Sequence, residues 1–103
     1  MSVPSEGSAE SPQTQLNRSL GSLWESHAGG RPQSINSGIA ENVVTCEIGT
    51  EAATPTSAAY RTAAIAAVTR ITGRRVTAFI PKHDSKTDIS TETFLLERLR
   101  IRR

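Results

Sequence analysis

The sequence has few aromatic residues, a single cysteine and no long apolar run. Its 103 residues include one Trp, one Tyr, two Phe and one Cys. One cysteine excludes an intramolecular disulfide, which is typical of proteins from a reducing compartment. No apolar stretch approaches the roughly 20 residues of a membrane-spanning helix, so we do not expect a channel or carrier. The acidic N-terminus lacks the apolar stretch of a signal peptide, and we expect a cytoplasmic protein.

Motifs for catalysis, metal binding and phosphate binding are also missing. We find no nucleophile elbow and no pair of carboxylates that stands out as an acid and a base. The Gly29–Pro32 segment lacks the Lys-Ser/Thr ending of a phosphate loop and follows a helix, so we interpret it as a helix terminator. The spacing of His83, Asp84 and Asp88 matches no standard metal-ligand pattern. We therefore expect a non-enzyme without a metal or cofactor.

Charge is unevenly distributed along the chain. Residues 1–60 hold two arginines and six glutamates, a formal charge of −4, whereas residues 61–103 hold ten basic and four acidic residues, a charge of +6. A basic half attracts phosphates, nucleic acid, anionic lipid or an acidic protein. The candidate partner-binding residues are arginines of this half: Arg70, Arg74, Arg75, Arg98, Arg100, Arg102 and Arg103.

Three segments follow from composition. Residues 1–12 are polar, cannot bury enough surface to offset their ordering entropy, and are expected to form a disordered tail. Residues 13–97 form the folded domain, whose core is thin enough that a partner or a second copy could add stability. Residues 98–103 form a basic tail in which arginines alternate with Leu99 and Ile101. Such a row could bind phosphates or an anionic membrane, or it could be a solubilising terminus.

Two amphipathic helices are predicted. The first spans 13–27, and Ser11 or Thr14 could cap its start. Its apolar face ends at His27, which we interpret as a half-buried residue at the end of the helix. The second spans 56–72, is rich in alanine and starts at Thr54-Pro55 or Thr56. Its apolar face comprises Tyr60, Ala64, Ala67, Val68 and Ile71. Gly73 has the position of a helix C-cap.

Four strands are predicted at 34–39, 43–48, 75–81 and 89–96, with a polar connection at 81–88. The first two form a hairpin, and Cys46 faces the same side as Val44 and Ile48, as a small buried residue. In the third strand, Val76, Ala78 and Ile80 share one face, with Thr77 and Phe79 on the other. In the last strand, Phe94 and Leu96 share a face.

The predicted fold is a small two-layer α+β domain. The order of elements is α-β-β-α-β-β, and the simplest packing is an antiparallel sheet with both helices on one face. Between the second helix and the third strand, the Thr72–Val76 segment joins a helix end to an alternating strand. This joint determines how the C-terminal half is built, and it carries no chemistry.

The joint also carries a resemblance to a known family. Residues 68–80, VTRITGRRVTAFI, resemble the VEELTGRRVRAFLS signature of the MpsC-like family, long catalogued as a domain of unknown function. Residues 88–97 resemble the family's closing strand, and residues 42–46 match the strand after its Gly-Arg-Gly-Pro turn, which residues 29–32 match approximately. The resemblance covers residues 15–97. The chain departs from the family at residues 49–69, which are shorter by about one helix.

The resemblance implies a role and no catalytic site. The family is named for the third component of a sodium-dependent membrane-potential-generating system related to inorganic-carbon uptake. The other components are membrane proteins, and this chain resembles the small soluble member. We therefore expect an accessory or regulatory subunit, peripheral to the membrane, that binds a membrane protein complex and could form a homodimer.

Two alternatives remain open at this point. A nucleic-acid-binding module would use the basic C-terminal half and would bind with a steep salt dependence. The absence of an aromatic stacking platform beside the arginines argues against single-strand binding. An enzyme would need a pocket with paired polar groups, and we find no candidate set for one.

Overall fold

The computed structural model describes residues 10–50 and 55–98, which form two helices and a four-stranded sheet. The elements are α1 (Pro12–Ala28), β1 (Ser34–Ala40), β2 (Val43–Gly49), α2 (Ala58–Thr72), β3 (Val76–Asp84) and β4 (Ile89–Leu96). This confirms the α+β class and the predicted order of elements. Most of the expected N-terminal tail and all but the first residue of the basic tail lie outside the described residues.

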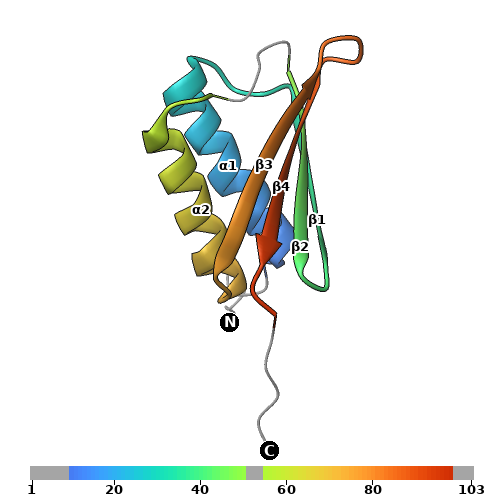
Figure 1. Cartoon of the computed structure of the whole chain (residues 1–103). Helices are drawn as coiled ribbons and strands as arrows, with labels where there is room; N and C mark the ends of the chain where they lie inside the picture. Colours follow the sequence, from blue (N-terminus) through green and yellow to red (C-terminus); the bar gives the residue numbers. More distant parts are fainter. Residues whose placement is uncertain (1–9, 51–54, 99–103) are drawn as a thin grey trace, which may run out of the picture.

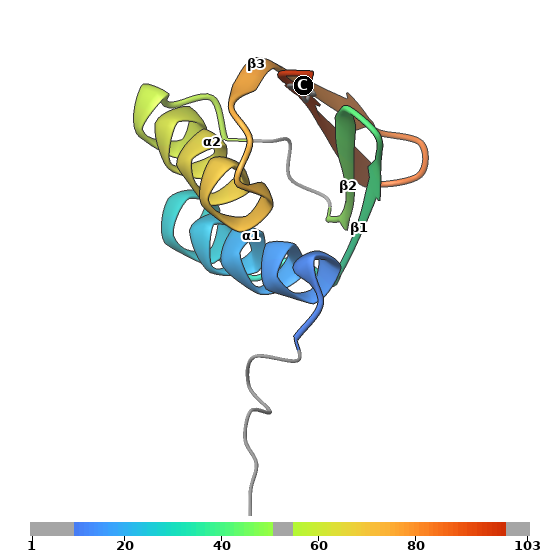
Figure 2. The same cartoon turned by 90° about the horizontal axis from the view of Figure 1, so that it is seen from below.

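The sheet is antiparallel throughout, with the strand order β1-β2-β4-β3. The β1–β2 hairpin is confirmed, and Glu41 takes a positive φ of 52° in its turn. The last strand, β4, lies between β2 and β3, so Val44 pairs with Phe94. Both helices lie side by side on one face of the sheet, and the described part of the chain places no helix on the other face (Figures 1 and 2).

Local capping sets the ends of both helices. Ser11 caps α1 by accepting a hydrogen bond from the Thr14 backbone N–H at 3.2 Å, and Gly29 ends the helix with φ 83°. The predicted start of α2 was wrong by two residues. Ser57 is the cap, because its backbone is extended and its hydroxyl accepts from the Tyr60 N–H at 3.1 Å. Gly73 closes α2 with φ 71°, as predicted.

The predicted face of Val76 is wrong, and a β-bulge is the reason, whereas Ala78 and Ile80 share a face opposite Phe79 as predicted. The register shifts between Val76 and Ala78, so Thr77 is an extra residue that reverses the alternation. Phe79 therefore faces the helices, with its ring 4.9 Å from that of Phe94, and Ile80 is 50% exposed on the opposite face. Val76 still packs against the core from the other side of the bulge.

The strand β3 is also longer than predicted. It continues through Pro81 to Asp84, so only residues 85–88 remain as the polar turn. Proline lacks a backbone N–H and is tolerated in a strand whose outer edge is unpaired. Because β3 is at the edge of the sheet, no neighbouring strand lies on its outer side, and Pro81 loses no interstrand hydrogen bond there.

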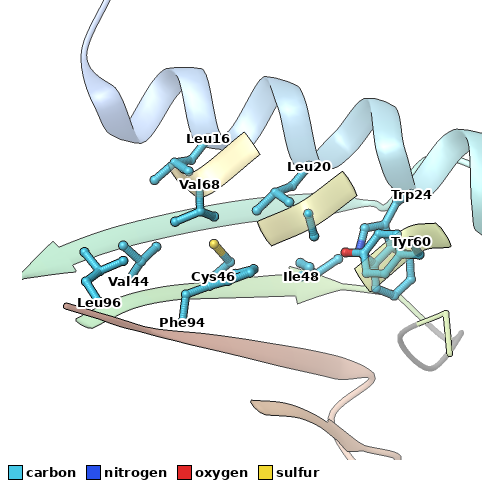
Figure 3. Packing of buried hydrophobic residues seen from close by; sticks show 11 residues of the cluster. Leu16, Leu20, Trp24, Val44, Cys46, Ile48, Tyr60, Val68, Phe94 and Leu96 are labelled. Carbon is cyan, nitrogen blue, oxygen red and sulfur yellow. The ribbon is translucent and has the colours of Figure 1, made fainter. Parts of the chain in front are cut away.

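The core lies between the helix layer and the sheet (Figure 3). Both predicted strand faces outside β3 are confirmed: Val44, Cys46 and Ile48 are fully buried, and Phe94 and Leu96 share the buried face of β4. The two helices contribute the remaining large buried side chains: Leu16, Leu20, Trp24, Tyr60 and Val68. Small residues such as Ala64 and Ala67 are buried in α2, which lets the two helices approach closely.

Candidate functional site: a basic end and a groove between the helices

The structure gathers four of the candidate arginines at one end of the domain. Arg70 is in the last turn of α2, and Arg74 and Arg75 follow directly after it. The Glu97 N–H donates to the Arg75 carbonyl at 2.8 Å, which places Arg98 near the start of β3. Arg70, Arg75 and Arg98 are exposed. The other three candidates, Arg100, Arg102 and Arg103, lie outside the described residues.

Arg74 differs from its neighbours because its guanidinium is used inside the domain. It donates to the Glu41 carbonyl at 2.7 Å, to Asn42 Oδ1 at 2.6 Å and to the Glu97 carbonyl at 2.7 Å. These acceptors belong to the β1–β2 turn and to the end of β4. Arg74 therefore ties two parts of the sheet to the end of α2, a structural role that its sequence position does not reveal.

An open groove lies between α1 and α2. Its volume is about 560 Å³. The lining side chains are mostly small, with an arginine from each helix: Arg18, Ser19, Ser22, Leu23, Ala63, Ala66, Ala67 and Arg70. The helices run antiparallel (Figure 1), so Arg18 near the start of α1 and Arg70 near the end of α2 lie at the same end of the groove.

The two groove arginines are in different electrostatic situations. Arg18 forms an ion pair with Glu10, just before α1. Arg70 forms no ion pair with any residue that the structure describes. Its guanidinium is therefore available to a carboxylate of a bound partner, and arginine binds carboxylates with two parallel hydrogen bonds.

A second depression lies between the start of α2 and the edge strand β3. Its volume is about 240 Å³, and Arg61, Lys82 and His83 are among the residues that line it. His83 Nδ1 is 2.8 Å from Ser90 Oγ, so this ring already has a partner inside the domain. The start of α2 and the Arg61 guanidinium favour an anion in this depression, whereas the alternation of β3 assigns the Lys82 side chain to the opposite face of the sheet.

The sequence predictions overlooked a buried polar cluster around Glu92. This carboxylate is fully buried on the central strand β4, where the Tyr60 hydroxyl lies 2.9 and 2.7 Å from its two oxygens. The Trp24 indole N–H also donates to it, at 3.3 Å. The signal was present in the sequence, because Glu92 alternates with Phe94 and Leu96 and must share their buried face.

Cys46 lies directly opposite Glu92 in the sheet. The Ser37 hydroxyl is 3.3 Å from its sulfur and 2.6 Å from Asn17 Oδ1. The pKa of the Cys46 thiol is raised to about 11, chiefly by burial; the hydrogen bond with Ser37 opposes this shift and the neighbouring Glu92 carboxylate adds to it. Burial, followed by the same carboxylate, also raises the pKa of Tyr60. The thiol is therefore protonated at neutral pH and enclosed, which makes it a poor nucleophile.

The remaining polar candidates do not assemble into a site. His27 is exposed, not half-buried as predicted, and its ring makes an edge contact with Tyr60 at 5.6 Å. Within residues 10–50 and 55–98, no three His, Cys, Asp or Glu side chains are grouped so as to hold a metal ion. In the same residues, neither helix combines the length and the apolar character needed to cross a bilayer.

Comparison of the chain with protein-family models, with curated proteins and with solved structures gives no match. Function is therefore inferred from the chemistry of the described surfaces and from the resemblance of the sequence.

Proposed function

We propose that this protein is a non-catalytic accessory or regulatory subunit that binds an acidic segment of a partner protein in the groove between α1 and α2. The observation that carries the proposal is the position of Arg18 and Arg70 at one end of an open groove lined by small side chains. The partner would be a component of a membrane complex, and the protein itself would be cytoplasmic and peripheral to the membrane.

The lining of the groove suits a helical or extended segment. Serine and alanine side chains allow another backbone to approach closely, and Leu23 provides an apolar contact within the groove. The guanidinium of Arg70, which has no ion-pair partner within the described ranges, would bind a carboxylate at the end of that segment. A partner with an apolar stripe and one or two acidic residues at its end therefore fits the groove.

The link to a membrane complex is supported by the resemblance to the MpsC-like family, whose named system contains membrane proteins. The basic end of the domain adds to this support. Exposed Arg75 and Arg98 lie at the end where the chain continues into the arginines of residues 100–103. Clustered arginines are attracted to the anionic cytoplasmic face of a membrane, at about 1 kcal/mol for each residue near the surface.

The test is a capture experiment from detergent-solubilised membranes with three single variants. Arg70→Glu reverses the charge at the groove end, and Ala66→Trp fills the groove without a change of charge. Arg61→Glu is the matched control, since Arg61 lies on the same helix and does not line the groove. We expect one membrane protein to be captured by the wild type and by Arg61→Glu, and to be lost with both groove variants.

A nucleic-acid assay at two salt concentrations separates the alternative function. Salt-sensitive binding of nucleic acid, without capture of a membrane protein, would overturn the accessory-subunit proposal. Deletion of residues 98–103 would then abolish the binding, because four of the arginines lie in that segment.

A further inference from the structure

No helix or strand of residues 10–50 and 55–98 covers the face of the sheet opposite the helices (Figures 1 and 2). The strand registers arrange its residues in rows that cross the sheet in the order β1-β2-β4-β3. The first row is Ala40, Val43, Leu95 and Ala78. The second is Gly38, Thr45, Thr93 and Ile80. The third is Asn36, Glu47, Thr91 and Lys82.

Charge is confined to one part of this face. The first two rows contain no charged residue, and Ile80 in the second row is 50% exposed. The third row contains one acid, Glu47 on β2, and one base, Lys82 on β3, at equal distances on either side of β4. Neither forms an ion pair with another residue in the described ranges. An uncharged patch flanked by unpaired charges of opposite sign is typical of an interaction surface.

We propose that this face binds the same face of a second copy, with a two-fold axis that runs along β4 between the two sheets. Rotation about this axis exchanges the positions of β2 and β3 and keeps every row opposite itself. Leu95 then meets the second copy's Leu95, and Thr45 meets Ile80. Glu47 of each copy meets Lys82 of the other, so two ion pairs form symmetrically on the two sides of the axis.

Charge complementarity also excludes the other simple symmetric arrangement. A two-fold axis perpendicular to the strands would reverse the order of the rows. The uncharged first row would then meet the far end of the face, where Asp84 lies beside Ile89, and it would lose its match with another uncharged row. Both axes keep the strands of the two sheets nearly aligned, the common arrangement of packed sheets, so the match between rows decides between them.

The expected dimer is a weak one. The three rows on β2, β4 and β3 cover a patch about 14 Å wide and about 17 Å long, from the ordinary spacings of strands and residues. This patch is smaller than the interfaces of stable complexes, so we expect a transient dimer with a dissociation constant in the high-micromolar range. The ion pairs at its sides contribute to the choice of partner and orientation more than to affinity.

The experiment is sedimentation velocity of the full chain over concentrations from about 10 to about 500 μM, which bracket micromolar association. We expect a monomer–dimer equilibrium for the wild type. Glu47→Lys and Lys82→Glu should each weaken dimerisation about tenfold or more, because each brings two pairs of like charges together. Lys86→Glu is the matched control, since Lys86 is exposed in the β3–β4 turn, away from the three rows.

The decisive sample is an equal mixture of the two single variants. In the mixed dimer, Lys at position 47 of one copy meets Glu at position 82 of the other, and the second pair keeps its native residues. We expect the mixture, and also the double variant E47K/K82E, to recover the wild-type affinity. Circular dichroism of each variant confirms folding, which surface substitutions at exposed positions should not impair.

A chain that stays monomeric at the highest concentration would overturn the inference. A dimer that is insensitive to both charge reversals would also overturn it and would indicate another surface, such as the free edge of β1. The groove of the proposed function lies on the helix layer, at the opposite side of the sheet. The dimer test and the capture test therefore fail independently.

Discussion

The Tyr60 hydroxyl lies 2.9 Å from Oε1 and 2.7 Å from Oε2 of Glu92, so its single proton is shared between both oxygens of a buried carboxylate. Trp24 adds an indole N–H at 3.3 Å. One carboxylate on the central strand β4 thus connects the sheet to both helices. A buried carboxylate is costly unless it is hydrogen-bonded, which makes these two donors essential for stability.

Tyr60→Phe should destabilise the fold by about 1–3 kcal/mol, because Glu92 keeps its burial and loses its closest donor. Urea unfolding followed by circular dichroism measures the free energy of unfolding. Thr62→Ala is the control on the exposed side of α2. In a double-mutant cycle, Glu92→Leu should make the subsequent loss of the Tyr60 hydroxyl much less costly. An equal cost in both backgrounds would contradict the role of this contact.

Stability should fall as the pH rises above about 9. The Cys46 thiol has a pKa of about 11 in the folded protein, against the ordinary value of 9.0. A raised folded pKa stabilises the fold fully below the unfolded pKa, and this contribution is lost as the pH rises through the folded value. Tyr60 acts with the same sign, because its pKa is also raised.

Cys46→Ala measures the contribution of the thiol to this pH dependence. The free energy of unfolding of the wild type should fall by about 1 kcal/mol more than that of the variant between about pH 8 and about pH 10. The pH dependence of the free energy of unfolding is compared between the two proteins, because the destabilisation caused by the smaller alanine side chain is the same at every pH and cancels. Equal slopes in the two proteins would show that the thiol is not the titrating group.

Arg74→Ala should destabilise the domain by about 1–3 kcal/mol, because three acceptors of the β1–β2 turn and of the β4 end lose their donor. Arg74→Lys should recover little, since one ammonium cannot reproduce the planar set of donors. Arg75→Ala is the exposed control beside it. If thermal unfolding shows the same midpoint for Arg74→Ala and Arg75→Ala, Arg74 has no structural role beyond that of its neighbour.

Gly73→Ala should cost about 1 kcal/mol of stability through backbone strain alone. Gly73 has a φ of 71°, and a Cβ atom at this position would meet nothing within 4 Å. Gly30→Ala is the control, because Gly30 has equally open space and no positive φ. The midpoint of thermal unfolding should fall for the first variant and stay level or rise for the second.

Much of the secondary structure follows from neighbouring residues in the sequence. The spacing of Leu16, Leu20 and Trp24 fixes the buried face of α1, and glycines fix the ends of both helices. Strict alternation places Val44, Cys46 and Ile48 on one face of β2. These features depend on contacts within one or two helical turns or on the alternation of side chains along a strand. They can therefore be predicted from the sequence without knowledge of the tertiary structure. The candidate arginines at 70, 74, 75 and 98 were visible in the same way, as a local excess of charge.

The tertiary structure decided what depends on distant partners. The bulge at Thr77 arises from pairing with β4, and it places Val76 on the face of Phe79, opposite Ala78 and Ile80. The hydrogen bonds of Arg74 join residues 23 to 33 positions apart, and those of Glu92 join residues 32 and 68 positions apart. The groove and the uncovered sheet face exist only because the helices pack antiparallel on one side. The sequence alone determined which elements form, since their signals are local; their partners and free surfaces were decided by packing, which joins residues that no local pattern connects.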